Sequence, residues 1–416
     1  VLLMALLLGS VSAIAFEYHT SVDSDLSTGS VTGPGGAASS VDEKLGYRAD
    51  IRMTGYQDDD DESEVVLLGL SLGSDLGVGS RMATLTNLKW EKTTTDYRLK
   101  LGDVMESFSQ YALSSSFKGL SYTHKLPKAR DLELTIAGGY AYPRWENLYA
   151  GKEVTATQRE VKGIRVASGT TSPSGITNGV SIVSSTDKSG IKPGDELYDN
   201  LVLSCDTEFT PIPNLTIRAV AALSDTTEKT NTTQAGGTAI KIEASSAAKQ
   251  GRATFEYERA TPGFMTAMGS GVADRQKVKL RISSNHTKSL TSTVGYLYTN
   301  DNLENQKTRT TVSNRPEIGI SMRRPFNRRY ASLGAALKYD FRRIAADTID
   351  RRTVSVDYKD RFGPIDTSFS VSKDSGGPVA SASEEMTYLV ELSTQAELGA
   401  ATLRPTLNSR LVTDRN

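Results

Sequence analysis

Apolar and charged residues alternate one by one along this chain, over runs of about ten residues that recur from end to end. In Tyr47–Met53 every odd position is apolar and every even position is charged. The same alternation returns in Tyr97–Leu101, Ala253–Glu258, Val278–Ile282 and Leu337–Arg342. A period of two residues is that of a β-strand whose two faces meet different surroundings. The sequence therefore predicts an all-β protein.

Two β architectures are compatible with this alternation. A soluble sandwich would turn the charged face to water and the apolar face to a dry core. A transmembrane barrel would turn the apolar face to lipid and the charged face to a wet lumen. An inner face with both signs of charge suits a lumen, because unpaired charges in a dry core cost several kcal/mol each.

The first residues favour a secreted or envelope protein. Val1–Gly9 is an apolar run, and Ala13-Ile14-Ala15 resembles a cleavage site, so residues 1–15 are predicted to be a signal peptide. We expect residues 16–416 to form a single outer-membrane β-barrel domain. The basic start of the signal is missing, and the chain stops at Thr413–Asn416 without a terminal aromatic strand. Both features indicate a fragment of a longer reading frame, so the barrel need not close within this chain.

Composition excludes several other classes of protein. The 48 basic and 49 acidic residues nearly cancel, so no overall positive field would attract nucleic acid. The mean hydropathy of −0.34 is too polar for a helical membrane protein. A single cysteine, Cys205, rules out an internal disulfide framework. Neither a linker nor a long apolar helix divides the chain, which favours one long antiparallel sheet.

The recurring strands indicate an up-and-down transmembrane barrel of roughly 16 to 20 strands. Residues 169–193, rich in Ser, Thr and Gly, are predicted to form a long external loop. For the stretch Met105–Ser116 the hypothesis is a short helix or an inward-folded constriction.

Charged residues in the middle of the predicted strands are the candidate lumen lining and would set charge selectivity. They are Arg48, Asp50, Arg52, Arg98, Lys100, Glu133, Arg218, Glu256, Lys279, Arg281, Lys338 and Asp340.

Several short segments carry a resemblance to known proteins: Leu101–Val104, Ser107–Ser109, Tyr111, Leu113, Phe117, Gly119, Gly139–Trp145, Gln158–Arg165, Pro262–Phe264 and Asp274–Arg275. In these segments the chain resembles a set of uncharacterised, porin-like outer-membrane β-barrels of Gram-negative bacteria. The resemblance is diffuse over most of the chain. It implies a barrel and assigns no activity, so it brings no functional residues with it.

No constellation of residues points to catalysis. The three histidines, His19, His124 and His286, fall on different predicted strands, and motifs of hydrolases or metalloenzymes are lacking. We predict no enzyme activity, no cofactor and no metal. An alternative in which His124 or His286 acts as a base in a barrel-embedded hydrolase stays open.

The predicted function is the passage of small hydrophilic solutes or ions through a charged lumen in the bacterial cell outer membrane. The expected partners are outer-membrane lipid and the solutes, and an envelope protein or a second copy of the chain stays open. One alternative is a non-transporting barrel that serves as a scaffold or docking partner of an envelope complex. The other is a secreted all-β binding protein.

Overall fold

The computed structural model describes residues 17–27, 46–59, 61–73, 83–126, 132–142, 145, 157–169, 175–189, 195–305, 307–344, 347–362, 365–378, 383–394, 396–398, 401–403 and 406–415. The predicted signal peptide, residues 1–15, lies outside them. In this part of the chain the residues form 21 antiparallel up-and-down strands, one more than the upper limit expected from the sequence. The all-β, up-and-down prediction is confirmed. No helix among the described residues has the length and apolarity needed to cross a bilayer.

The chain divides into two compact units. The first consists of residues 1–205, 224–236 and 265–270, and the second of residues 206–223, 237–264 and 271–416. Three strands contribute residues to both units: β10 (Tyr198–Ile212), β11 (Leu215–Glu228) and β12 (Gln234–Ala248).

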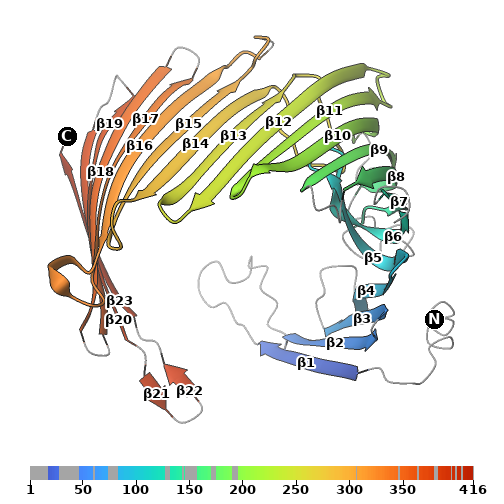
Figure 1. Ribbon diagram of the computed structural model, residues 1–416, viewed down its shortest axis with the longest axis horizontal. Coiled ribbons are helices and arrows are strands. Elements are labelled where there is room, and N and C mark those ends of the chain that lie inside the picture. Colours follow the sequence, from blue (N-terminus) through green and yellow to red (C-terminus); the bar gives the residue numbers. More distant parts are fainter. Residues whose placement is uncertain are drawn as a thin grey trace, which may run out of the picture. The chain divides into compact units, whose positions relative to one another are not determined.

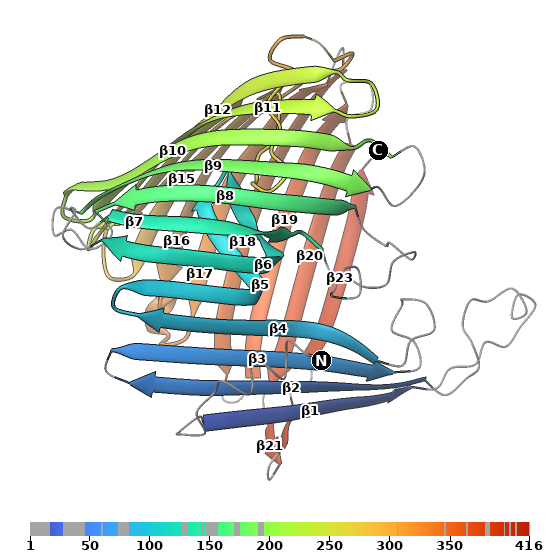
Figure 2. The same ribbon diagram turned by 90° about the vertical axis from the view of Figure 1, so that its right-hand side faces the viewer.

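In the first unit, each strand pairs with the next one along the chain (Figure 2). The strands are β1 (Glu17–Ser27), β2 (Gly46–Asp59), β3 (Glu62–Gly73), β4 (Ala83–Thr94), β5 (Tyr97–Ser109), β6 (Leu113–Leu126), β7 (Leu132–Tyr140), β8 (Gln158–Ser168) and β9 (Ile176–Ser189).

The second unit follows the same sequential plan (Figure 1). Its strands are β13 (Gly251–Ala260), β14 (Arg275–Asn285), β15 (Leu290–Asp301), β16 (Thr311–Arg323), β17 (Ser332–Ile344), β18 (Asp347–Phe362), β19 (Ile365–Pro378), β20 (Ser383–Thr394) and β23 (Thr406–Arg415). A separate small hairpin joins β21 (Ala396–Leu398) to β22 (Ala401–Leu403). The one short helical turn within the described residues, Pro325–Asn327, lies between β16 and β17.

Two local predictions need correction. The long loop expected at residues 169–193 contains strand β9, which pairs with β8 along its length. Strand β9 does alternate between apolar and polar residues, but its polar residues are serines and not charged residues. Val180 and Ile182 are exposed, whereas Ser181 and Ser185 are buried. Met105–Ser116 forms no helix, because β5 continues to Ser109 and β6 begins at Leu113.

Candidate functional site: two faces of opposite polarity

The exposed face of the second unit carries a continuous apolar row. Five residues lie directly opposite one another on five successive strands, β14 to β18. They are Ile282, Val294, Ile318, Leu337 and Val354, and between 42% and 59% of each is exposed. Cross-strand neighbours on one face are in contact, so the row is one apolar surface rather than scattered residues.

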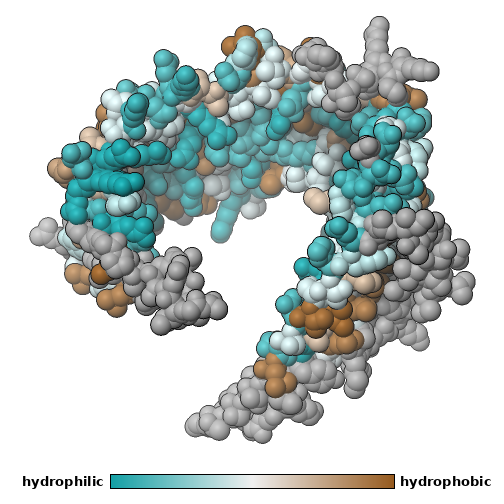
Figure 3. All heavy atoms as spheres, turned by 60° about the horizontal axis from the view of Figure 1, so that its bottom comes forward, coloured by the Kyte–Doolittle hydropathy of each residue, from teal (hydrophilic) through white to brown (hydrophobic). Residues whose placement is uncertain are grey.

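The opposite face of the same strands is polar and ionic. One residue further along, the cross-strand row reads Arg281, Gly295, Glu317, Lys338 and Thr353. Ion pairs bridge neighbouring strands on this face. Their N–O distances are 2.9 Å for Lys277–Glu256, 3.1 Å for Arg315–Asp340 and 2.8 Å for Arg351–Asp374. Figure 3 presents a side of the molecule on which hydrophilic residues predominate over smaller apolar patches.

In the first unit the sheet also has one apolar and one polar face, and the polar face is the buried one. Tyr122, Ile136, Ile164 and Ile182 form a cross-strand row on β6 to β9, and each is between 37% and 52% exposed. The neighbouring row on the other face is Thr123, Thr135, Arg165 and Ser181. Thr123, Thr135 and Ser181 are buried. This arrangement is the reverse of a water-soluble sheet, which buries its apolar face.

The register places predicted lumen residues of each unit on its polar face. In the first unit these residues are Arg48, Asp50, Arg52, Arg98, Lys100 and Glu133. In the second they are Glu256, Lys279, Arg281, Lys338 and Asp340. Arg218, the remaining predicted residue, lies on β11 in the second unit. That this face lines a lumen stays a prediction.

Several of these charges are already neutralised by a neighbour. Arg48 lies 2.9 Å from Asp50, and Arg218 lies 2.7 Å from Glu208. Lys100 is only 13% exposed and lies 2.8 Å from Glu106. Lys279, Arg281 and Lys338 are exposed to solvent. These three are therefore the better candidates for contact with a passing solute.

The end of the β5–β6 hairpin folds onto the polar face of the first unit. The hydroxyl of Ser109 lies 2.7 Å from that of Ser204, 95 residues further along the chain, and Arg165 donates to the carbonyl of Phe108. Phe108 packs so closely on β8 that a Cβ placed on Gly163 would lie 2.7 Å from its ring. The segment therefore packs on the polar face of the sheet as the end of a hairpin, and that it constricts a lumen stays a prediction.

A dense apolar cluster forms where this hairpin end meets the sheet. Its members are almost completely buried and come from the hairpin and from the strands beneath it. They are Val104, Phe108, Tyr111, Leu113, Phe117, Val161, Val183 and Val202. Because they are buried together on an otherwise polar face, they form a strongly dehydrated patch there.

A second segment, Met265–Ser270, lies on the same hairpin end and is called the strap here. The amide of Ser114 donates to the carbonyl of Met268 at 3.0 Å, and the amide of Ser270 donates to that of Gln110 at 2.7 Å. A Cβ on Gly269 would collide with the carbonyl of Tyr111. Glycine is needed here because the two backbones approach so closely.

Two polar residues, the buried Asn200 and the half-buried Arg159, anchor the strap to the sheet. Asn200 donates to the carbonyl of Met265 at 2.9 Å and accepts from the amide of Ala267 at 3.1 Å. Arg159 donates to the carbonyl of Ala267 at 2.9 Å. The buried carboxylate of Asp187 holds that guanidinium through two hydrogen bonds of 2.7 and 3.0 Å.

Sequence reasoning missed Arg159, Asp187, Asn200 and the strap. Asp187 falls in the segment predicted to be a loop at 169–193, and Arg159 enters only through the resemblance. A usable signal does exist at Ser107-Phe108-Ser109, where an aromatic residue falls on the face that otherwise carries Arg98 and Lys100. Such a reversal of polarity indicates a segment packed on that face.

The histidines show no catalytic arrangement in the described chain. His286 Nε2 lies 2.7 Å from Ser292 Oγ in an exposed turn, and His124 lies 3.5 Å from the hydroxyl of Tyr122. Among the described residues no carboxylate contacts either ring to orient it, as a Ser–His–Asp arrangement requires. No cluster of His, Cys, Asp and Glu within them could hold a metal ion.

Comparisons with known proteins give structural likenesses only. No family model and no curated protein matches the chain. Among solved structures, the P pilus usher (PapC) translocation pore has a TM-score of 0.44 at 10% identity, covering 96% of this chain and 97% of its own. OccK9 (OpdG) of Pseudomonas aeruginosa has a TM-score of 0.39 at 12% identity, covering 87% and 97%.

The anion-selective porin of Comamonas acidovorans has a TM-score of 0.38 at 10% identity, covering 68% of this chain and 90% of its own. The resembling proteins are outer-membrane β-barrels. Because the identities are this low and the TM-scores are below 0.5, the likenesses carry no argument about this chain.

Proposed function

We propose that this chain is a porin-like β-barrel protein of the bacterial outer membrane. Its apolar face contacts lipid, and its ionic face lines a path for small hydrophilic solutes or ions. The observation that supports the proposal most is the row Ile282, Val294, Ile318, Leu337 and Val354, exposed on five neighbouring strands. Full burial of each such side chain is worth about 1.5 to 3 kcal/mol, so a large free energy favours an apolar solvent over water.

The height of the apolar surface is suited to a bilayer. Above the row just named, a second row contains Ile320, Ala335, Val356 and Val371, and a third contains Met322, Leu333, Tyr358 and Phe369. Below it lie Leu280 and Tyr296. Rows on one face are about 7 Å apart, so four rows span about 20 Å, close to the apolar band of a transmembrane barrel.

Transport would depend on the width of the path and on its electrostatics. Lys279, Arg281 and Lys338 offer exposed positive charge, and Glu317, opposite Lys338, offers negative charge. The hairpin end and the strap occupy part of the polar face in the first unit. They would narrow the path there and restrict passage to small solutes.

Planar bilayer recording tests the transport function. Purified full-length protein should produce discrete conductance steps in KCl. In a KCl gradient the reversal potential should move toward cation selectivity when Lys279, Arg281 and Lys338 are all changed to Met. Arg48→Met combined with Asp50→Asn is the matched control, because removing both partners of this ion pair leaves the net charge unchanged. Absence of conductance at all salt concentrations and voltages would remove the channel function.

A second candidate function is a non-transporting outer-membrane barrel that serves as a scaffold or docking partner. The apolar cluster around Phe108 and Tyr111 favours it, because a dehydrated cluster on the inner face would block the passage of water. Membrane insertion without conductance, together with an envelope protein that co-purifies in a fixed ratio, would support this function over transport.

A further inference from the structure

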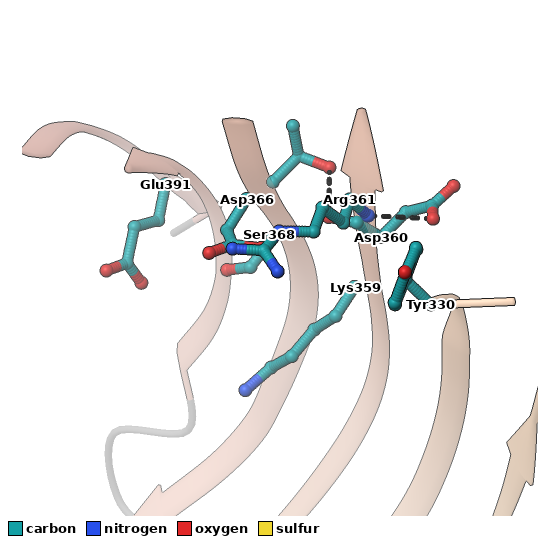
Figure 4. Close-up of a pocket in the computed structure, with 8 residues that line it drawn as sticks. Tyr330, Lys359, Asp360, Arg361, Asp366, Ser368 and Glu391 are labelled. Atoms are coloured by element: carbon teal, nitrogen blue, oxygen red, sulfur yellow. Dashed lines mark hydrogen bonds and ion pairs between the residues drawn. The ribbon is translucent and has the colours of Figure 1, made fainter. Parts of the chain in front are cut away.

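A polar cavity of about 370 Å³ lies at one end of the second unit, outside the hairpin end and the strap. It is built from the ends of β18, β19 and β20 and from the turn between β16 and β17 (Figure 4). Lys359, Ser368 and Glu391 are directly opposite one another on the three strands, so their side chains share one face. Neighbouring strands are about 4.8 Å apart, which puts the α-carbons of Lys359 and Glu391 about 10 Å from each other.

Two ion pairs and an aromatic ring, together called the frame here, lie beside these three residues at the end of the strands, and Asp360, which follows Lys359 on β18, lies on the other face. The carboxylate of Asp360 is almost completely buried, accepts from the hydroxyl of Tyr358 at 2.9 Å and lies 2.7 Å from Arg328. Arg361 lies 3.1 Å from Asp366. The ring of Tyr330 forms a wall of the cavity, with the guanidinium of Arg361 6.0 Å from its centre.

Each charged side chain of the frame is paired with one of opposite sign. Arg328 offsets Asp360, and Arg361 offsets Asp366. Among the side chains that the structure describes, neither Lys359 nor Glu391 has an ion-pair partner, and both line the cavity. In Figure 4 the Lys359 side chain extends toward the side of the cavity on which Glu391 lies. An anion alone or a cation alone would therefore satisfy only one of the two.

We propose that this cavity binds a small zwitterion of the size of a dipeptide, which carries one carboxylate and one ammonium group. Lys359 pairs with the carboxylate, Glu391 with the ammonium group, and the hydroxyl of Ser368 lies between them. Because both partners are accessible to water, binding is weak, with a Kd on the order of 1 mM. Weak binding suits a path along which solutes must also leave. The inference rests on the proposed function and deepens it by naming a class of solute.

The test is a titration of the full-length protein in deuterated detergent, followed by saturation-transfer NMR. The probes are alanyl-alanine, its N-acetyl derivative without an ammonium group, and its C-terminal amide without a carboxylate. Alanyl-alanine should bind at least five times more tightly than either derivative. Equal binding of the three probes, or binding of none, would refute the proposal.

Variants then assign the two charges. Lys359→Met should abolish the preference for alanyl-alanine over its C-terminal amide. Glu391→Gln should abolish the preference for alanyl-alanine over its N-acetyl derivative. The charge exchange Lys359→Glu with Glu391→Lys should restore both preferences. Lys288→Met, in the exposed turn between β14 and β15 and outside the cavity, should change neither, and an equal effect there would also refute the site.

Bilayer recording of the same preparations separates this proposal from the proposed function. Conductance without selective binding refutes the zwitterion site alone. Selective binding without conductance supports the site and refutes transport.

Discussion

At the scale of single residues, adjacent side chains on one strand are expected to meet different solvents. Leu337 and Lys338 are both exposed on β17, yet they point to opposite faces. Cys205, the only cysteine, is exposed on β10 beside the exposed Leu203. Exposure alone therefore cannot tell lipid from water, whereas chemical labelling in a membrane can.

Cysteine labelling provides that distinction. In a Cys205→Ser background reconstituted into liposomes, Lys338→Cys should react quickly with a water-soluble, charged thiol reagent. Leu337→Cys should react at least ten times more slowly, because lipid excludes the charged reagent. In urea, where the strands are unfolded, the two rates should become equal. Faster reaction of Leu337→Cys in liposomes would mean that the two faces have been assigned the wrong way round.

A buried ion pair next to an aromatic ring supports a second residue-scale prediction. Lys118, only 6% exposed at its side chain, pairs with Asp103, and the indole of Trp145 donates to the same carboxylate at 2.9 Å. Asp103→Asn leaves the Lys118 ammonium group without its counter-charge and should lower the free energy of unfolding by about 3 kcal/mol. Urea unfolding in detergent measures the change.

Lys118→Met in the Asp103→Asn background is the control for that measurement. The double variant should recover most of the lost stability, because removing both charges also removes the unpaired one. If the losses of the two single variants simply add, the ion pair does not contribute as described.

At the scale of elements, the β5–β6 hairpin end and the strap form one layer that is packed on the polar face of the first unit. Their mutual hydrogen bonds and the anchors Asn200 and Arg159 hold them on the polar face of the first unit. Gly163 matters because only a residue without a side chain leaves room for the ring of Phe108. The close approach makes the position of the layer sensitive to one methyl group.

Gly163→Ala should displace the hairpin end from the sheet, because its new Cβ would lie 2.7 Å from the Phe108 ring. We expect more frequent or larger conductance steps in bilayer recordings and faster proteolysis near Tyr111. Phe108→Ala in the same protein should reverse the increase in proteolysis, since the clash is gone. Gly295→Ala is the control, because the nearest atom to its Cβ would be 3.4 Å away. Unchanged conductance and proteolysis in Gly163→Ala would contradict an inward-packed layer that limits the path.

At the scale of the whole molecule, both units share the reversed polarity of their faces. In each unit the exposed apolar residues form continuous cross-strand rows, unlike the single scattered apolar residues usual on the surface of soluble monomers. The overall composition, with 38% hydrophobic residues, does not reveal these rows, because a soluble protein of the same composition would bury such residues.

The folded chain should therefore require an amphiphile. Refolding from urea into detergent micelles should give a monodisperse species rich in β-structure. Refolding into buffer alone should give aggregates, because the apolar rows of different copies would associate. A soluble, monodisperse β-rich protein in plain buffer would support the secreted binding protein instead of the barrel.

The alternation in the sequence is sufficient to predict the class of fold, most of the strands and which charged residues share a face. Alternation is a local property, because a period of two residues is written into each strand separately. The residues Tyr47–Met53 and Leu337–Arg342 therefore indicate strands by themselves, and they lie within β2 and β17. Strand β9 escapes this reasoning because its buried face carries serine, which looks like loop composition.

Only the tertiary structure could reveal the layer packed on the polar face and the cavity. Ser109 meets Ser204 across 95 residues, and Arg159 meets Ala267 across 108. Lys359 and Glu391 become neighbours only through the register of three strands. Such contacts depend on how strands pair and how a hairpin end bends, and neither property leaves a periodic trace in the sequence. The face on which a side chain lies follows from its position in the strand, whereas the residues that it contacts on that face depend on the tertiary fold.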